Sequence, residues 1–195
     1  IILEIDNKSM TNRPDLWGHY GIAREIAALY DLPMKEFPHF DRNVENTSGF
    51  HVTVEDAERC PRMTGTQIEN VCVKPAPYWM QVRIWKTGMR PINALVDITN
   101  YVMLATGQPS HAYDSDHIAG HIIVRRAKAG ETLTLLNGKE LPLSTDDLTI
   151  ADDAGIVGLA GVMGGAKDSI LPTTSKVILE IANFQAAGIR RTALR

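Results

Sequence analysis

The order of the predicted elements along the chain indicates an α+β fold. Apolar residues recur at helical spacing in the first half, over about 14–33, 74–88 and 92–106. Beyond residue 120 the pattern changes to short β-branched runs separated by turns, and Asn137-Gly138 between two such runs is a strong hairpin signal. Because helices cluster early and strands late, the order favours α+β over alternating βαβ units.

Composition sets limits on the class of protein. The 195 residues include 20 Lys plus Arg and 23 Asp plus Glu, a net charge of −3, and 44% are hydrophobic. These values are typical of a globular chain. We find no apolar run of about 18 residues, so no membrane span is predicted. The slight acidic excess argues against a duplex-DNA-binding protein, and the two local basic patches are interpreted as solvated faces (Arg83, Lys86 and Arg90; Arg125, Arg126 and Lys128).

The segment before residue 49 is predicted to contain a strand, a helix and a linker. Ile1–Ile5 is apolar, and Pro14 suits a first helical position, from which helical spacing continues to Pro33. Residues 34–48 have weak periodicity and several Pro, Asn and Asp residues, so we place a domain boundary there.

The rest of the chain follows with its own start and stop signals. Gly88 and Gly107 are predicted to end the two later helices. Further strands are predicted at 50–54, 63–73, 121–125, 131–136, 148–151, 156–160 and 177–181. Two cysteines are too few for a disulfide framework, which indicates a reducing, cytoplasmic compartment, and Cys72 is expected to be a small core residue.

Polar residues on the helix at 92–106 are candidates for a binding site. Asn93, Asp97 and Asn100 fall at i, i+4 and i+7 and form one polar stripe, with an apolar face (Leu95, Ile98 and Val102) elsewhere on the helix. Short amides and a carboxylate suit a buried network or a ligand, although an amphipathic surface helix would give the same spacing.

His111 follows this helix and is expected in a constrained loop after Gly107-Gln108-Pro109. A histidine there is a candidate acid, base or orienting group, or a structural side chain bonded to backbone. No metal site is predicted, because His111 and the later residues Asp114, His117 and His121 do not have typical ligand spacing.

Two other features depart from ordinary core composition. In Gly158–Gly165, four glycines would let the backbone approach a ligand closely, or pack a tight turn, and the run matches no nucleotide-binding motif. Glu180 is a lone acid in an apolar strand, on the same face as Ile178 and Ala182. Because burying an unpaired carboxylate is costly, Glu180 is either an ion-pair anchor or a reader of a polar substrate group.

Four separated motifs carry a resemblance that spans essentially the whole chain. NRPDLWGHYGIAREIAALYDLP, RPINALVDITNYVMLATGQPSHAYD, LAGVMGG and VILEIANF resemble, in order and spacing, the beta subunit of bacterial phenylalanyl-tRNA synthetase. The resemblance implies that 1–38 is the tail of a preceding domain and that 39–195 is an editing domain. It further implies that this α+β domain is built around a mixed or antiparallel β-barrel-like sheet.

The activity that the resemblance implies is hydrolysis of tyrosine wrongly attached to the phenylalanine tRNA. Glu180 matches the position that reads the tyrosine hydroxyl. The positions that match the hydrolytic pocket and its walls are Arg90, Thr99, Asn100, His111, Gly164, Gly165 and Ala182. In this interpretation His111 orients or deprotonates water, Asn100 and Thr99 position the water or the terminal ribose, and Arg90 holds the acceptor end. Ser110 and Tyr113 depart from the family's more frequent Leu or Met and Phe.

Cofactors and partners are likewise implied by the resemblance. This part of the chain would need no cofactor, whereas the full synthetase uses ATP and Mg. Implied partners are the tRNA acceptor end, tyrosine as a ligand, and an alpha subunit in a heterotetramer, with no membrane and no DNA. Two alternatives stay open: a non-catalytic module that binds RNA or a subunit, and a free-standing hydrolase that edits in trans. The first 38 residues argue against the second alternative, because they resemble the tail of a neighbouring domain.

Overall fold

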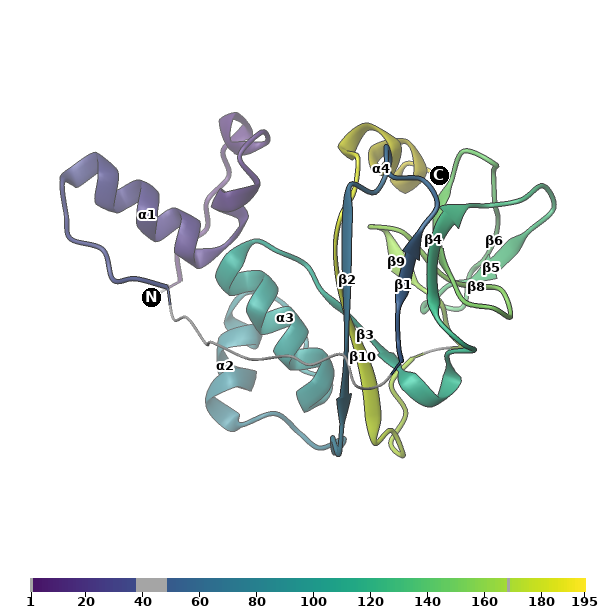
Figure 1. Ribbon diagram of the computed structural model, residues 1–195. Helices are drawn as coiled ribbons and strands as arrows, with labels where there is room; N and C mark the ends of the chain where they lie inside the picture. Colours follow the sequence, from purple (N-terminus) through teal and green to yellow (C-terminus); the bar gives the residue numbers. More distant parts are fainter. Residues whose placement is uncertain (1, 38–48, 168) are drawn as a thin grey trace. The chain divides into compact units, whose positions relative to one another are not determined.

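The computed structural model describes residues 2–37, 49–167 and 169–195, and these residues form two compact units (Figure 1). Unit 1 comprises the described parts of Ile1–Glu45 together with Lys74–Ser110, and unit 2 those of Asn46–Val73 and His111–Arg195. Helices make up unit 1 and strands dominate unit 2, so the predicted α+β class is confirmed. The predicted boundary between 38 and 39 falls at 38–48, which lies outside the described residues.

The described residues of unit 1 form three α-helices and two short 3-10 helices. These elements are η1 (Lys8–Met10), η2 (Pro14–Trp17), α1 (His19–Tyr30), α2 (Tyr78–Lys86) and α3 (Ala94–Thr106). Gly18, at the start of α1, comes so close to the end of α3 that an added Cβ would lie 2.3 Å from the Gly107 nitrogen. Residues 2–5 form no strand, contrary to prediction, because the structure gives them no pairing strand and leaves their apolar side chains exposed.

Helix α3 starts and ends as local chemistry dictates. The Asn93 side chain caps it by accepting hydrogen bonds from Leu95 N and Val96 N, and Gly107 ends it at a φ of 79°. The predicted stripe is therefore altered, since Asn93 is the cap rather than a face residue. The predicted apolar face is also wrong: Ile98 and Val102 are exposed, whereas the positions packed against α2 include Ala94 and Tyr101.

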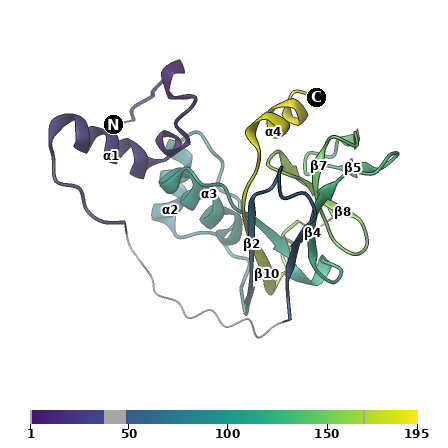
Figure 2. The same ribbon diagram turned by 45° about the horizontal axis from the view of Figure 1, so that its top comes forward.

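Unit 2 contains three sheets, and no closed barrel forms within the described strands. The five-stranded sheet has the order β1 (Val52–Val54), β4 (Ile122–Arg126), β7 (Leu148–Ala151), β8 (Ile156–Leu159) and β9 (Met163–Gly164), in which only β1 and β4 are parallel. The three-stranded sheet has β10 (Lys176–Asn183) between β2 (Arg62–Glu69) and β3 (His111–Asp114). Figure 2 shows β2 and β10 side by side. β5 (Thr132–Thr134) and β6 (Glu140–Pro142) form the hairpin predicted at Asn137-Gly138.

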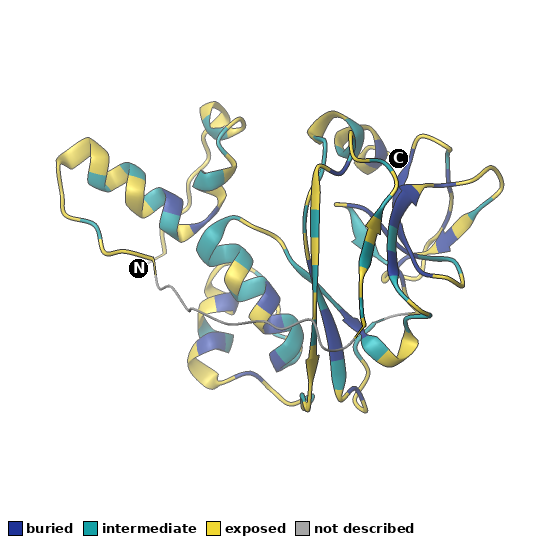
Figure 3. Ribbon diagram, in the orientation of Figure 1, coloured by how far each residue is buried: buried dark blue, intermediate teal, exposed yellow. Residues whose placement is uncertain are grey.

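The core of unit 2 lies between the two larger sheets. Tyr113 and Ile178 from the three-stranded sheet share one buried cluster with Val124, Ile150 and Val157 from the five-stranded sheet. In Figure 3, buried positions are seen on strands of both sheets. A 3-10 turn, η3 (Ser115–His117), follows β3, and α4 (Ala186–Ala193) ends the chain; neither was predicted. Cys60 is buried and Cys72 exposed, so the core position expected for Cys72 is wrong. None of the helices in the described residues has the length and apolar character needed to cross a membrane.

Candidate functional site

Strand pairing brings His111 and Glu180 together. β10 runs antiparallel to β3, and Glu180 is the direct register partner of His111. Directly opposed residues in an antiparallel pair project to the same face, with Cβ atoms about 5 Å apart. The loop predicted for His111 is wrong, because pairing with β10, which local periodicity cannot reveal, makes 111–114 a strand.

Tyr113 completes this cluster and is the residue that sequence reasoning missed. It lies two positions after His111 and therefore on the same strand face. Its hydroxyl donates a hydrogen bond to Glu180 Oε2 at 2.5 Å, and its ring packs edge-on against the His111 ring with centroids 4.5 Å apart. Two features of the sequence could have predicted its role. On a strand, Tyr113 shares a face with His111, and a lone buried acid such as Glu180 needs a hydrogen-bond donor.

Burial controls the charges of the cluster. Glu180 is only 7% exposed, and this burial raises the pKa of its carboxyl to about 6. The hydrogen bond from Tyr113 acts in the opposite direction and lowers the pKa. No cation pairs with Glu180 among the described residues, so the ion-pair alternative finds no support. Burial also lowers the pKa of His111, which keeps its imidazole neutral at neutral pH and able to accept a proton.

Glycines of the 158–165 run form the wall next to these side chains. A Cβ added to Gly164 would lie 2.8 Å from both Cε1 and Nε2 of His111, so any other residue there would require the imidazole to move. Gly158, on the neighbouring strand, faces the Tyr113 hydroxyl at 3.6 Å from its would-be Cβ. Gly165 follows in the same run and is also paired within the sheet: its N–H donates to the Val157 carbonyl, and it bridges to Leu135.

The remaining predicted residues divide between the units. Ala182 lies on β10 two residues after Glu180 and opposite Met63, which puts it on the Glu180 face. Thr99 and Asn100 lie on α3, where the Thr99 hydroxyl donates to the Val96 carbonyl at 2.7 Å, and exposed Arg90 lies between α2 and α3. These three residues belong to unit 1, so their part in a site with His111 and Glu180 stays a prediction.

A metal centre does not emerge from the described residues, in which no three His, Cys, Asp or Glu side chains are grouped to hold an ion. Two later histidines have acidic neighbours. His117 lies 3.8 Å from Asp114, and His121 lies 3.1 Å from Asp153 and stacks on His51.

A known protein family matches the part of the chain that contains this cluster. The family described as the B3/4 domain matches residues 59–195, which include α2, α3 and every described strand except β1. The chain belongs to the B3/4 domain family. The resemblance drawn from the four motifs is confirmed, because proteins similar to this chain are named as beta subunits of phenylalanine–tRNA ligase.

Two such relatives illustrate the similarity of this B3/4 chain. The subunit from Solibacter usitatus is 48% identical over 192 residues, covering 98% of this chain and 25% of the relative. The subunit from Latilactobacillus sakei is 41% identical over 200 residues, covering 98% and 24%. The B3/4 chain thus spans about a quarter of the length of the curated relatives that it matches.

A solved structure shares the fold of this B3/4 chain. The N-terminal fragment of the phenylalanyl-tRNA synthetase beta subunit from Pyrococcus horikoshii aligns with a TM-score of 0.54 at 18% identity. The alignment covers 97% of this chain and 59% of that fragment. At this identity the similarity establishes the fold alone.

Proposed function

We propose that this B3/4 domain is an editing module that hydrolyses tyrosine esterified to the phenylalanine tRNA. The observation that carries the proposal is the environment of Glu180: a buried carboxylate, without a cation partner among the described residues, that accepts a hydrogen bond from a phenol. The hydroxyl of a tyrosine substrate is also a phenol. A carboxylate has two oxygens, so accepting from Tyr113 does not exhaust its capacity.

Recognition by Glu180 answers a physical need. An apolar pocket shaped for phenylalanine rejects an added hydroxyl by only about a hundredfold. A second site that hydrogen-bonds the hydroxyl inverts this preference, because a phenylalanine ester would leave the buried acceptor without its donor. Glu180 is that acceptor in the proposal, Ala182 keeps the wall beside it small, and Gly164 and Gly165 line the amino acid.

His111 is the group that handles the proton. In its neutral form it accepts a proton from water as the water oxygen attacks the ester carbonyl carbon. The bond from this carbon to the ribose oxygen then breaks, the proton passes to the ribose oxygen, and free tyrosine leaves. Asn100 and Thr99 position the water or the ribose, and Arg90 holds the acceptor end, as the motifs imply.

The proposal extends to the complete protein. The quarter-length match to ligase beta subunits supports a complete chain that joins an alpha subunit in a heterotetramer, in the cytoplasm, and takes part in charging tRNA with phenylalanine. The ATP and Mg of that reaction would act elsewhere in the synthetase.

The experiment compares His111→Ala with the matched control His117→Ala in the complete protein. We expect His111→Ala to slow deacylation of preformed tyrosyl-tRNA by about 10²-fold or more, since it removes the proton acceptor. Attachment of phenylalanine should stay near wild type in both variants, and His117→Ala should deacylate normally. Unchanged deacylation in His111→Ala would contradict the catalytic role and leave the binding-module alternative.

Glu180→Ala tests recognition in the same assay. Loss of the carboxylate should lower the ratio of tyrosyl-tRNA to phenylalanyl-tRNA hydrolysis by about tenfold or more, because a buried hydrogen bond to a charged group is lost. An unchanged ratio would rule out Glu180 as the reader.

A further inference from the structure

Helix α2 exposes an unusual set of side chains on one face. Within α2, Met80 and Ile84 are buried, whereas Tyr78, Trp79 and Trp85 are 81%, 51% and 70% exposed. At 100° per residue, the exposed residues occupy one continuous arc opposite Met80 and Ile84. We name this arc the α2 aromatic–basic face, and its members are Tyr78, Trp79, Arg83, Trp85 and Lys86.

The segment that carries this face exposes only positive charge. Residues 74–110 contain four cations (Lys74, Arg83, Lys86 and Arg90) and one acid, Asp97. Asp97 is only 1% exposed and accepts a hydrogen bond from the Ile92 backbone N–H at 2.8 Å. The second segment of unit 1 therefore presents cations without an exposed carboxylate, in a chain whose net charge is negative.

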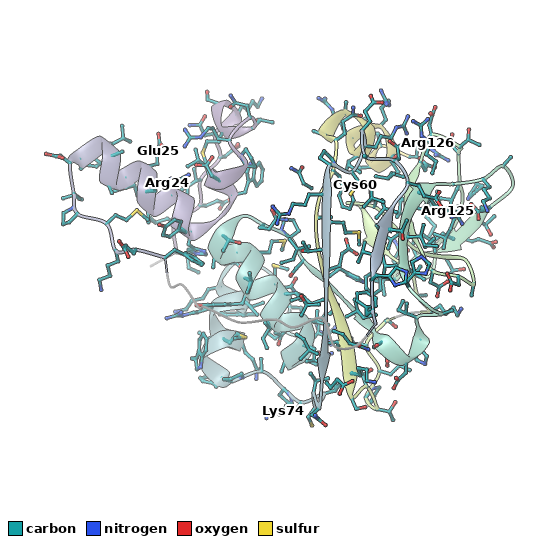
Figure 4. The ribbon with its side chains drawn as sticks, in the orientation of Figure 1. Arg24, Glu25, Cys60, Lys74, Arg125 and Arg126 are labelled. Carbon is teal, nitrogen blue, oxygen red and sulfur yellow. The ribbon has the colours of Figure 1, made fainter. Side chains whose placement is uncertain are left out.

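These cations differ from two arginines of unit 2. Arg125 and Arg126, labelled in Figure 4, are neutralised by nearby acids: Arg125 binds Glu131 at 2.8 Å and Arg126 binds Asp56 at 2.6 Å. None of the four cations at 74–110 has an ion-pair partner among the residues that the structure describes. Their charge is available to a partner.

Part of the face is already ordered. The Arg83 guanidinium lies over the Trp79 ring at 5.2 Å from its centroid and donates a hydrogen bond to the Tyr101 hydroxyl at 2.6 Å. The rings of Trp79 and Tyr101 meet edge to face, with centroids 5.5 Å apart. Because α2 and α3 hold these groups in place, little side-chain entropy is lost when a ligand binds them.

The helix dipole explains the exposed cations of this face but not its exposed aromatic residues. Arg83 and Lys86 lie in the last turn of α2, where cations stabilise the helix dipole. The dipole gives no reason for two tryptophans and a tyrosine to be exposed among those cations. Aromatic rings interleaved with unpaired cations are what a single-stranded nucleic acid requires, since bases stack on rings and phosphates bind cations.

We infer that the α2 aromatic–basic face binds single-stranded RNA, with bases stacked on its rings and phosphates on Arg83 and Lys86. The inference rests on the proposed function in one respect, that the complete protein handles tRNA. It adds a strand-binding surface that lies outside the His111–Glu180 cluster and does not take part in hydrolysis.

The test measures the affinity of the complete protein for a fluorescent, unstructured RNA octamer by anisotropy. Trp85→Ala should weaken binding about tenfold, the usual effect of removing one stacking ring. Lys86→Ala should weaken binding and lower the slope of log affinity against log salt by about 0.7, since one phosphate contact is lost. The matched controls are Trp17→Ala, an equally exposed tryptophan on η2, and Lys139→Ala, an exposed lysine of unit 2; both should bind as wild type.

Circular dichroism would first establish that the variants are folded. We expect them to fold, because the substituted side chains are exposed. Wild-type affinity in both Trp85→Ala and Lys86→Ala would overturn the inference. So would normal RNA affinity combined with loss of subunit assembly, which would assign the face to a protein partner. His111→Ala should bind the octamer normally, so a failure of the hydrolytic proposal is distinguishable from a failure of this one.

Discussion

A carboxylate in the middle of a buried strand needs hydrogen-bond donors or a cation nearby to offset the cost of removing it from water. Glu180 has apolar neighbours along β10, and its identified donor is the hydroxyl of Tyr113. One hydrogen bond from a neutral donor offsets only part of the cost of desolvating a charge, and therefore the pKa of Glu180 is raised to about 6. Such a residue weakens the fold above that pH, which is typical of a group kept for function.

This raised pKa predicts a pH-dependent stability. As pH rises from about 4.5 to above 6, Glu180 loses its proton more readily in the unfolded chain than in the folded one, so its contribution to folding falls by about 2 kcal/mol. Glu180→Gln keeps an acceptor for Tyr113 but cannot ionise. Urea unfolding should therefore show the variant gaining about 2 kcal/mol relative to wild type between pH 4.5 and 7.5.

The matched control is Glu140→Gln, at an exposed position on β6. Its free energy of unfolding relative to wild type should show no comparable rise over the same range. A Glu180→Gln variant that runs parallel to wild type across this range would mean that the carboxylate is better solvated than its burial indicates.

At the level of elements, two neighbouring pairs of strands build the cluster. β3 and β10 supply His111, Tyr113 and Glu180 through their register, and β8 with β9 supplies the glycine wall. Gly158 and Gly164 are opposed on β8 and β9, and neither has the positive φ that would itself demand glycine. The requirement at Gly164 is thus one of space, set by the imidazole beside it.

Gly164→Ala should expose that requirement. Its Cβ would lie 2.8 Å from two imidazole atoms, so the ring must shift, and we expect a loss of about 1–3 kcal/mol together with slower deacylation of tyrosyl-tRNA. Gly158→Ala is the matched control, because its nearest neighbour is at the ordinary contact distance of 3.6 Å. Equal stability and equal hydrolysis in the two variants would show that the imidazole is not held against this wall.

At the scale of the whole molecule, the two units differ in the size of their cores. In the described part of unit 1, one small buried cluster lies between α2 and α3, formed by Ala76, Met80, Ile84 and Ala94. Unit 2 buries a larger cluster between its two main sheets and a second one beside the β5–β6 hairpin. Since apolar burial is the main favourable term in folding, local opening should require less free energy in unit 1.

Native-state hydrogen exchange measures this difference directly. Ile84 and Val124 are both fully buried, so solvent access to the side chain does not separate them. We expect the Ile84 amide to exchange with a lower opening free energy than the Val124 amide. Equal opening free energies would indicate that both units unfold together as one cooperative structure.

Local chemistry accounts for much of what could be foreseen. The limits of α3 follow from Asn93 and Gly107, and the hairpin follows from Asn137-Gly138. The alternation in β10 identified Glu180 as a residue that needs a partner, although it did not identify which one. The short strand β9 and the helix α4 escaped notice, because β9 has two residues and α4 has eight, which is too few to establish a period.

The sequence by itself determined the α+β class, the family resemblance and the unusual standing of His111 and Glu180, because composition, turn residues and periodicity act over a few neighbouring residues. Only the tertiary structure decided that His111 lies on a strand, that Tyr113, 67 residues before Glu180, is its donor, and that Gly164 packs on the imidazole. These contacts depend on strand register between distant segments, which is selected by packing of the whole sheet rather than by any local preference.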